Sequence, residues 1–167
     1  MELARCEWLD DRENLIVLGN PGTGKTHLSI ALGMAACQRG YGVRFVTAAG
    51  LVNTLVEARN EKALLKLQRQ LGKIPLLIVD ELGYVPFSKT GSELLFEIFS
   101  QRYERGSILV TTNLPFDEWT SALGSERLTG ALLDRLTHRI HILPIEEPSY
   151  RLAQSKRRRP CKQAKKG

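Results

Sequence analysis

The stretch GNPGTGKT, Gly19 to Thr26, decides the fold of this chain. It matches G-x-x-x-x-G-K-[ST] at every fixed position, a pattern whose glycines let backbone N–H groups point inward around phosphate oxygens. The apolar run NLIVLG leads into it, and the segment from Lys25 to Gly40 repeats apolar residues at helical spacing. A strand, a glycine-rich loop and a helix therefore follow one another, as a phosphate-binding loop requires.

The chemistry of this loop assigns roles to its residues. Lys25 would reach the β- and γ-phosphates of a nucleoside triphosphate, and the hydroxyl of Thr26 would bind Mg²⁺. The N-terminus of the following helix adds a positive dipole. We therefore expect ATP and Mg²⁺ as cofactors. The expected nucleotide contacts are Gly19, Asn20, Pro21, Gly22, Thr23, Gly24, Lys25, Thr26 and His27. For His27, packing or capping in the first helical turn is the alternative.

A second apolar run, PLLIVDEL from Pro75 to Leu82, ends in two adjacent carboxylates. Its continuous hydrophobicity is typical of a central parallel strand that is buried on both faces. We expect Asp80, at the tip of the strand, to organise Mg²⁺ across from the phosphate-binding loop. Glu81 points the other way and is suited to polarise the attacking water. The alternative is that Asp80 only caps and that Glu81 is solvated.

A third buried strand is predicted in SILVTTNLPF, residues 107–116, which carries small polar groups beyond its apolar part. Asn113 is the candidate for holding the attacking water at the tip of this strand. Because Asn and Pro favour turns, a turn-forming asparagine is the alternative. The roles of Thr111 and Thr112 stay open.

Two more strands, at 41–48 and 138–145, bring the expected number to five, and helical patterns separate most of them. This alternation predicts a three-layer α/β/α sandwich around a five-stranded, mostly parallel sheet. Right-handed crossovers would set all five strands parallel and bring the three motifs together at their carboxyl ends.

Transfer of the γ-phosphoryl group builds negative charge that an arginine can stabilise. The segment SERLTGALLDRLTHRI, residues 125–140, offers Arg127, Arg135 and Arg139. If Arg135 lies away from the phosphate-binding loop of its own chain, it can serve only the nucleotide of a neighbouring copy. An ordinary surface arginine is the alternative for each of the three.

Charge is distributed unevenly along the chain. The net charge is +6, but no acid follows Tyr150, and residues 1–150 hold sixteen basic against eighteen acidic residues. The basic tail, residues 153–167, is expected to be disordered when free, and it either binds polyanions such as DNA or is a solvated terminus. Because no run approaches the roughly 18 apolar residues of a membrane span, we expect a cytoplasmic protein without a membrane partner.

Taken together, these motifs resemble the IstB-type AAA+ ATPases, helper proteins of insertion-sequence transposition, and are similar to the DnaC-type helicase loaders. The resemblance is carried by GNPGTGKTHLSIALG, LLIVDELGYVPF, LLFEIFSQRYERGSILVTTNLPFDEW, ALLDRL and PSYRL, and covers residues 14–152. It implies an ATPase domain of the P-loop AAA+ type without a full lid domain. By this resemblance Arg135 takes the arginine-finger position, and Arg151 takes the position of a second nucleotide sensor.

The resemblance also implies ATP-driven assembly into a homo-oligomeric ring or spiral on DNA and contact with a transposase. A helicase loader is the alternative function, and a small-molecule kinase or an inactive ATP-binding fragment are further ones. Relatives usually carry a partner-binding domain before the ATPase domain, whereas residues 1–13 offer only a short lead-in.

The segment LVNTLVEARNEKALLKLQRQLGK, residues 51–73, predicts a helix with one basic face. Its basic residues at helical gaps are Arg59, Lys62, Lys66, Arg69 and Lys73. Since the resembled loaders and initiators present helical structure to nucleic acid in this region, we expect Lys62, Lys66 and Arg69 to contact DNA phosphates without reading sequence. A solvated face is the alternative, and a break at Asn60 would remove Arg59 from it.

Overall fold

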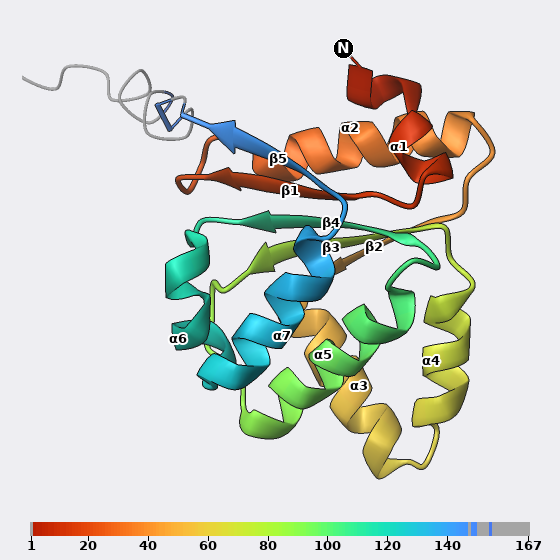
Figure 1. Ribbon diagram of the computed structural model, residues 1–167, viewed down its shortest axis with the longest axis vertical. Helices are drawn as coiled ribbons and strands as arrows, with labels where there is room; N and C mark the ends of the chain where they lie inside the picture. The colour runs from red at the N-terminus through yellow and green to blue at the C-terminus, as the bar shows by residue number, and fades with distance from the viewer. Residues whose placement is uncertain (1, 147, 150–153, 155–167) are drawn as a thin grey trace, which may run out of the picture.

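The computed structural model describes residues 2–146, 148–149 and 154, which build a parallel sheet between two layers of helices (Figure 1). The strands are β1 (Asn14–Gly19), β2 (Val43–Thr47), β3 (Leu76–Leu82), β4 (Ser107–Thr112) and β5 (Ile140–Ile145). They lie in the order β2-β3-β4-β1-β5, and every neighbouring pair is parallel. The predicted three-layer sandwich and its five parallel strands are confirmed.

Strand β4 lies between β1 and β3, so the strand that leads to the phosphate-binding loop and the strand that ends in Asp80 are not neighbours. After β1 the chain crosses to β2 at one edge of the sheet, and β3 and β4 then fill the positions between β2 and β1. It finally passes β1 to form β5 at the other edge. Ligands of open parallel sheets bind at such a reversal of strand order, outside the carboxyl ends of the strands.

The central strands are apolar because both of their faces are covered. On β1, Ile16 packs into one hydrophobic core, whereas Leu15 and Val17 pack into the other. Residues of β4 are buried along its whole length, while the edge strands β2 and β5 are only partly covered. A continuous apolar run therefore marks a central position in this sheet.

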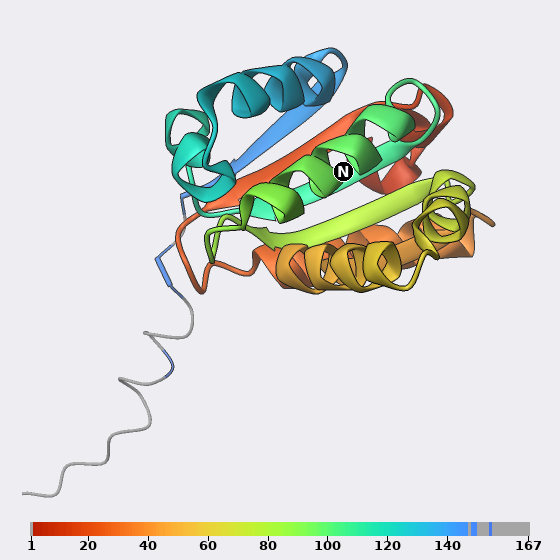
Figure 2. The ribbon, with the colours of Figure 1, turned by 90° about the horizontal axis from the view of Figure 1, so that it is seen from below.

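One layer of helices covers the first face of the sheet, and the other layer covers the second. The first layer contains the short helices η1 (Glu2–Arg5) and α1 (Glu7–Asp10) and the long helix α2 (Lys25–Gln38). The second contains α3 (Ala48–Asn60), α4 (Leu64–Gly72), α5 (Lys89–Arg102) and α7 (Glu126–Thr137), and near them lie η2 (Phe116–Glu118) and α6 (Trp119–Leu123). Figure 2 shows α3, α5 and α7 side by side across this second face. No helix within the described residues is long and apolar enough to cross a membrane.

Residues 51–73 do not form one helix: α3 ends at Asn60, where the sequence left a break open, and the chain turns before α4. Lys62 adopts a left-handed conformation with φ of 58°. The backbone N–H of Ala63 donates to the carbonyl of Ala58 at 2.7 Å, and that of Lys62 donates to Arg59 at 3.2 Å. This pair of bonds is a Schellman ending, which most often uses glycine at the position that Lys62 holds.

A buried arginine fastens α5 to the far ends of the strands. Arg102 is 2% exposed, and its guanidinium donates to the carbonyls of Leu71 at 2.7 Å, Ser107 at 2.8 Å and Pro75 at 3.3 Å. Desolvation by burial lowers the pKa of Arg102 to about 10, which still leaves it charged at neutral pH. The sequence gives no sign of this role, because the arginine is surrounded by residues of an ordinary helix.

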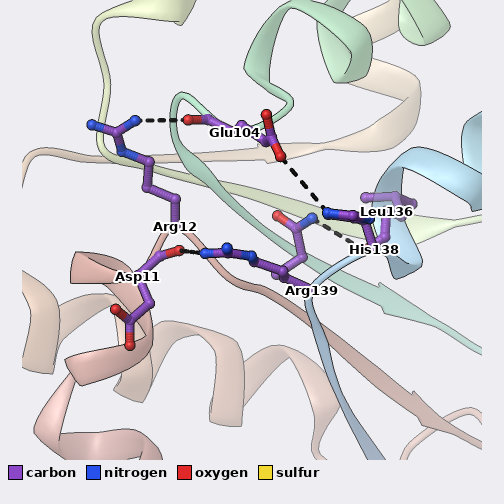
Figure 3. A network of polar contacts seen from close by, with 7 residues as sticks. Asp11, Arg12, Glu104, Leu136, His138 and Arg139 are labelled. Atoms are coloured by element: carbon purple, nitrogen blue, oxygen red, sulfur yellow. Dashed lines mark hydrogen bonds and ion pairs between the residues drawn. The ribbon is translucent and has the colours of Figure 1, made fainter.

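At the amino ends of the strands, polar contacts tie the first residues to later segments (Figure 3). The guanidinium of Arg12 donates to the carbonyl of Glu104 at 2.8 Å, and Arg139 donates to the carbonyl of Asp11 at 3.4 Å. His138 lies 3.7 Å from the carboxylate of Glu104. Residues before β1 are therefore joined to the loop that precedes β4 and to the end of α7.

Candidate functional site

The phosphate-binding loop connects β1 to α2 at the carboxyl end of the sheet. Gly22 and Gly24 have φ of 79° and 94°, in the left-handed region that favours glycine. Helix α2 starts at Lys25, and Gly24, which precedes it, provides no side chain to cap it. The first turn of α2 therefore lies beside the loop, and the N-terminus of a helix favours an anion.

Lys25 extends into this loop. Its ammonium group donates hydrogen bonds to the carbonyls of Gly19 at 2.7 Å and Asn20 at 2.8 Å. The hydroxyl of Thr23 donates to the same Asn20 carbonyl at 2.8 Å. The loop therefore surrounds a positive charge, which suits it to an anion such as a triphosphate.

Thr26 and Asp80 meet although they lie 54 positions apart in the chain. The hydroxyl of Thr26 donates to the carboxylate of Asp80, with distances of 2.9 and 3.2 Å to its two oxygens. Asp80 is 3% exposed and lies between the buried Val79 and the exposed Glu81 on β3. A hydroxyl and a carboxylate side by side, next to a phosphate cradle, are the hard oxygen ligands that Mg²⁺ uses in nucleotide sites, so these residues fit that ion.

Glu81 lies in β3 at an irregularity of the sheet. The pairing of β3 with β4 shifts register between Val79 and Leu82, and Glu81 has φ of 59°. The hydroxyl of Thr111, on β4, accepts a hydrogen bond of 2.9 Å from the backbone N–H of Glu81 and donates one to Asp80. A bulge re-aims the side chain that it carries, and Glu81 is exposed while Asp80 is buried.

Most of these groups line one cavity of about 640 Å³, within the range of small-molecule sites. Asp80 does not line it, but it accepts a hydrogen bond from Thr26, which does. The loop contributes Pro21, Gly22, Thr23, Gly24, Lys25, Thr26 and His27. The other strand ends contribute Glu81, Thr111, Thr112 and Asn113. The sequence motifs expected to converge therefore lie around a single opening. Of the expected contacts, Gly19 and Asn20 do not line it, because their carbonyls are turned to Lys25.

Tyr84 also lines the cavity and was not singled out from the sequence. It follows Gly83, which has φ of +86°, in the loop between β3 and α5, and it is 71% exposed. A tyrosine in this position could have been suspected only from its closeness to Glu81 in the chain.

The arginine candidates lie elsewhere. Arg135, on α7, does not line the phosphate cavity; its guanidinium lies 4.9 Å from the centre of the Phe96 ring and donates to the carbonyl of Ala131 at 3.1 Å. Arg139 is at the amino ends of the strands, opposite the phosphate-binding loop, where it contacts Asp11 (Figure 3). Arg151 and most of the basic tail lie outside the described residues.

Helix α4 presents a basic face, but a smaller one than expected. Its inner face buries Gln68 and Leu71, and Gln68 donates to the carboxylate of Glu97 on α5 at 3.1 Å. Lys66 and Arg69 are exposed on the opposite face, given 100° per residue. Lys62 lies in the turn before α4 and is exposed as well, so its direction is not set by the helix.

Comparison with known proteins gives a consistent result. The family model described as IstB-like ATP binding protein matches residues 1–158. A protein of insertion sequence IS5376 from Geobacillus stearothermophilus, named for ATP binding, is 41% identical over 155 residues, or 93% of this chain. Its counterpart of insertion sequence IS21 from Pseudomonas aeruginosa is 40% identical over 156 residues. The chain spans 62% and 59% of the lengths of these two relatives.

Solved structures share the fold at lower identity. The DnaC helicase loader has a TM-score of 0.71 and 24% identity, over 87% of this chain and 85% of that one. The replication initiator DnaA, solved with AMPPCP and single-stranded DNA, has a TM-score of 0.71 and 24% identity over 88% of this chain and 45% of its own. These likenesses support the three-layer α/β fold.

Proposed function

Because this chain belongs to the IstB-like ATP binding protein family, we propose that it binds ATP with Mg²⁺ and hydrolyses it in the service of an insertion sequence. The observation that carries the proposal is the contact between Thr26 and Asp80 at 2.9 Å, beside a loop that encloses Lys25. Phosphoryl transfer needs a phosphate-binding loop, a positively charged side chain such as Lys25, and oxygen ligands for a metal ion such as those of Thr26 and Asp80. In this chain these groups come from distant segments.

In the proposed reaction, the loop and Lys25 hold the β- and γ-phosphates, and Thr26 and Asp80 hold Mg²⁺. The ion, when bound, would neutralise charge on the phosphate oxygens. Glu81 lines the same cavity and accepts a proton as the oxygen of water forms a bond to the γ-phosphorus. The bond between that phosphorus and the bridging oxygen breaks, and ADP and phosphate leave. Asn113 orients the water from the tip of β4.

Arg135 completes the reaction from a neighbouring copy. It lies outside the phosphate cavity of its own chain, so an arginine at this position can stabilise charge on the γ-phosphoryl group only in trans. Hydrolysis then depends on assembly, and we expect a ring or spiral of identical chains.

The biological setting follows from the relatives, which are proteins of insertion sequences. We propose that the assembled protein contacts DNA phosphates through Lys62, Lys66 and Arg69 and engages a transposase. The helicase loader stays the alternative, since both functions use the same ATP site. We prefer transposition, because the DnaC likeness at 24% identity concerns the fold, whereas relatives near 40% identity belong to insertion sequences.

The test is ATP hydrolysis per chain as a function of protein concentration, with and without duplex DNA. We expect activity per chain to rise with concentration, and Lys25→Ala to abolish ATP binding and hydrolysis together. An Arg105→Ala variant is the control, since it removes an exposed basic side chain that lines neither the phosphate cavity nor the cavity beside α7. Activity that is absent at every concentration would refute hydrolysis, and activity that is unchanged by dilution would refute the role of Arg135 in trans.

A further inference from the structure

A second cavity, of about 580 Å³, lies between α5 and the segment that runs from the end of α6 into α7. It shares no lining residue with the phosphate cavity. Its apolar walls are formed by Phe87, Phe96, Leu123, Leu128 and Ala131. We call it the α5–α7 cavity. A cleft of this size with such walls is suited to an inserted apolar side chain.

Positive charge surrounds these apolar walls. Lys89, Arg127 and Arg135 line the α5–α7 cavity, against a single acid, Glu93, among the described lining residues. The first turns of two long helices border it too, since α5 begins at Lys89 and α7 at Glu126. Helix N-termini carry partial positive charge. The cavity therefore favours an occupant that is apolar at its centre and negative at its edge.

The same chain offers a matching protrusion. In the loop from Gly83 to Pro86, the large side chains of Tyr84 and Val85 are 71% and 50% exposed. Tyr84 lines the phosphate cavity, and Val85 follows it in the chain. Glu81, which is exposed, supplies negative charge next to them, and bound triphosphate would add more. We call residues 83–86 the Tyr84 loop. Its chemistry is complementary to that of the α5–α7 cavity.

We propose that the Tyr84 loop of one copy inserts into the α5–α7 cavity of the next copy. The two surfaces are different parts of the chain, so the contact is heterologous and each copy keeps one unused surface for a further copy, as in a ring or filament. Tyr84 lines the phosphate cavity of its own chain, and Arg135 lines the α5–α7 cavity. Insertion therefore brings Arg135 of one copy to the ATP of another. In this respect the inference rests on the proposed function.

The experiment uses two variants that each lose one surface. Val85→Asp places a charge on the protrusion, and Ala131→Trp fills the cavity from the surface of α7; neither residue lines the phosphate cavity. Sedimentation velocity with ATP should show each variant as a monomer at concentrations where the unchanged protein assembles. An equimolar mixture should form dimers and nothing larger, because only one intact protrusion and one intact cavity can meet.

Met34→Asp is the matched control for Val85→Asp, since Met34 is an apolar side chain, 60% exposed, on α2. It should assemble like the unchanged protein. The inference is overturned if either variant assembles normally, if the mixture stays monomeric, or if the unchanged protein never self-associates. In that last case a partner protein would be the occupant to consider. Binding of a fluorescent ATP analogue, measured on each variant, reports the proposed ATP site separately.

The mixture also tests the direction of the contact. In the predicted dimer, the complete site combines the phosphate cavity of the Ala131→Trp chain with Arg135 of the Val85→Asp chain. Adding Arg135→Ala to the Val85→Asp chain should therefore lower ATP hydrolysis by the mixture by about 10³-fold relative to adding it to the other chain. Equal losses in the two arrangements would overturn the assignment. The dimer itself would still be judged by sedimentation if hydrolysis proved absent.

Discussion

The hydroxyl of Thr111 accepts a hydrogen bond of 2.9 Å from the backbone N–H of Glu81. The same hydroxyl donates to the carboxylate of Asp80, and Thr111 is fully buried. One side chain on β4 thus holds two consecutive residues of β3, at the place where the pairing of the strands shifts register. The hydroxyl of Thr111 therefore helps to hold the buried carboxylate of Asp80 and the backbone of the exposed Glu81 in place.

Removing the hydroxyl of Thr111 should disturb the positions of Asp80 and Glu81 without removing the groups that bind ATP. Thr111→Val keeps the branched shape but leaves the N–H of Glu81 and one oxygen of Asp80 without their partner. We expect kcat for ATP hydrolysis to fall by about 10- to 100-fold, as for other residues that orient metal ligands. The affinity for ATP should change much less, because the phosphate-binding loop is untouched.

Thr111→Ser is the matched control, since it restores the hydroxyl. It should recover most of kcat in steady-state kinetics. If the valine variant hydrolysed ATP at the full rate, the bonds of Thr111 would have only a structural meaning.

Glu81→Gln should hydrolyse ATP about 10²- to 10⁴-fold more slowly, because an amide cannot accept the proton of the attacking water. Since Glu81 is exposed and makes its hydrogen bond to Thr111 through the backbone, the substitution should leave the fold and the ATP affinity intact. Single-turnover hydrolysis and equilibrium binding of ATP measure the two effects. Glu57→Gln, at an exposed acid on α3 that lines neither cavity, is the control.

The sequence predicts the site better than it predicts the connections around it. Strand ends that carry Asp80 and Asn113 were expected to converge on Lys25, since parallel strands place their carboxyl ends together, and the structure puts all three motifs at that edge. The bulge at Glu81 was not foreseen, because its cause is a hydroxyl thirty residues further along the chain. Long-range hydrogen bonds of this kind leave no local pattern.

Local exceptions explain the other differences. The sequence left open a break at Asn60, and α3 ends there. The turn that follows has no glycine to mark it, because Lys62 adopts the left-handed conformation that glycine usually provides. Arg102 was not noticed because nothing in a sequence distinguishes a buried arginine from the exposed ones that are more common.

Reversing two charges on α4 should weaken DNA binding. Lys66→Glu with Arg69→Glu changes exposed residues opposite the buried face of the helix, so folding should be little affected. If both residues contact phosphates, the slope of log affinity against log salt concentration should become shallower by about 1.8, or 0.9 for each contact with duplex DNA. Fluorescence anisotropy over a salt series measures this slope.

Arg39→Glu is the comparison, because Arg39 is exposed just after α2, in the other layer of helices. It should lower the affinity less and leave the slope nearly unchanged. An unaltered slope in the α4 double variant would show that this face is only solvated.

Arg102→Met should destabilise the protein more than any surface change. The substitution keeps an unbranched apolar side chain of similar reach but removes the hydrogen bonds of the guanidinium to the carbonyls of Leu71, Pro75 and Ser107. A hydrogen bond to a charged group contributes about 1.5–3 kcal/mol, so the free energy of unfolding should fall by about 3 kcal/mol or more. Urea denaturation measures this change. Arg105→Met, at an exposed arginine three residues away, is the control and should stay within about 0.5 kcal/mol of the unchanged protein. If the two variants were equally stable, the free-energy cost of burying the charge of Arg102 would be as large as the stabilisation from its hydrogen bonds.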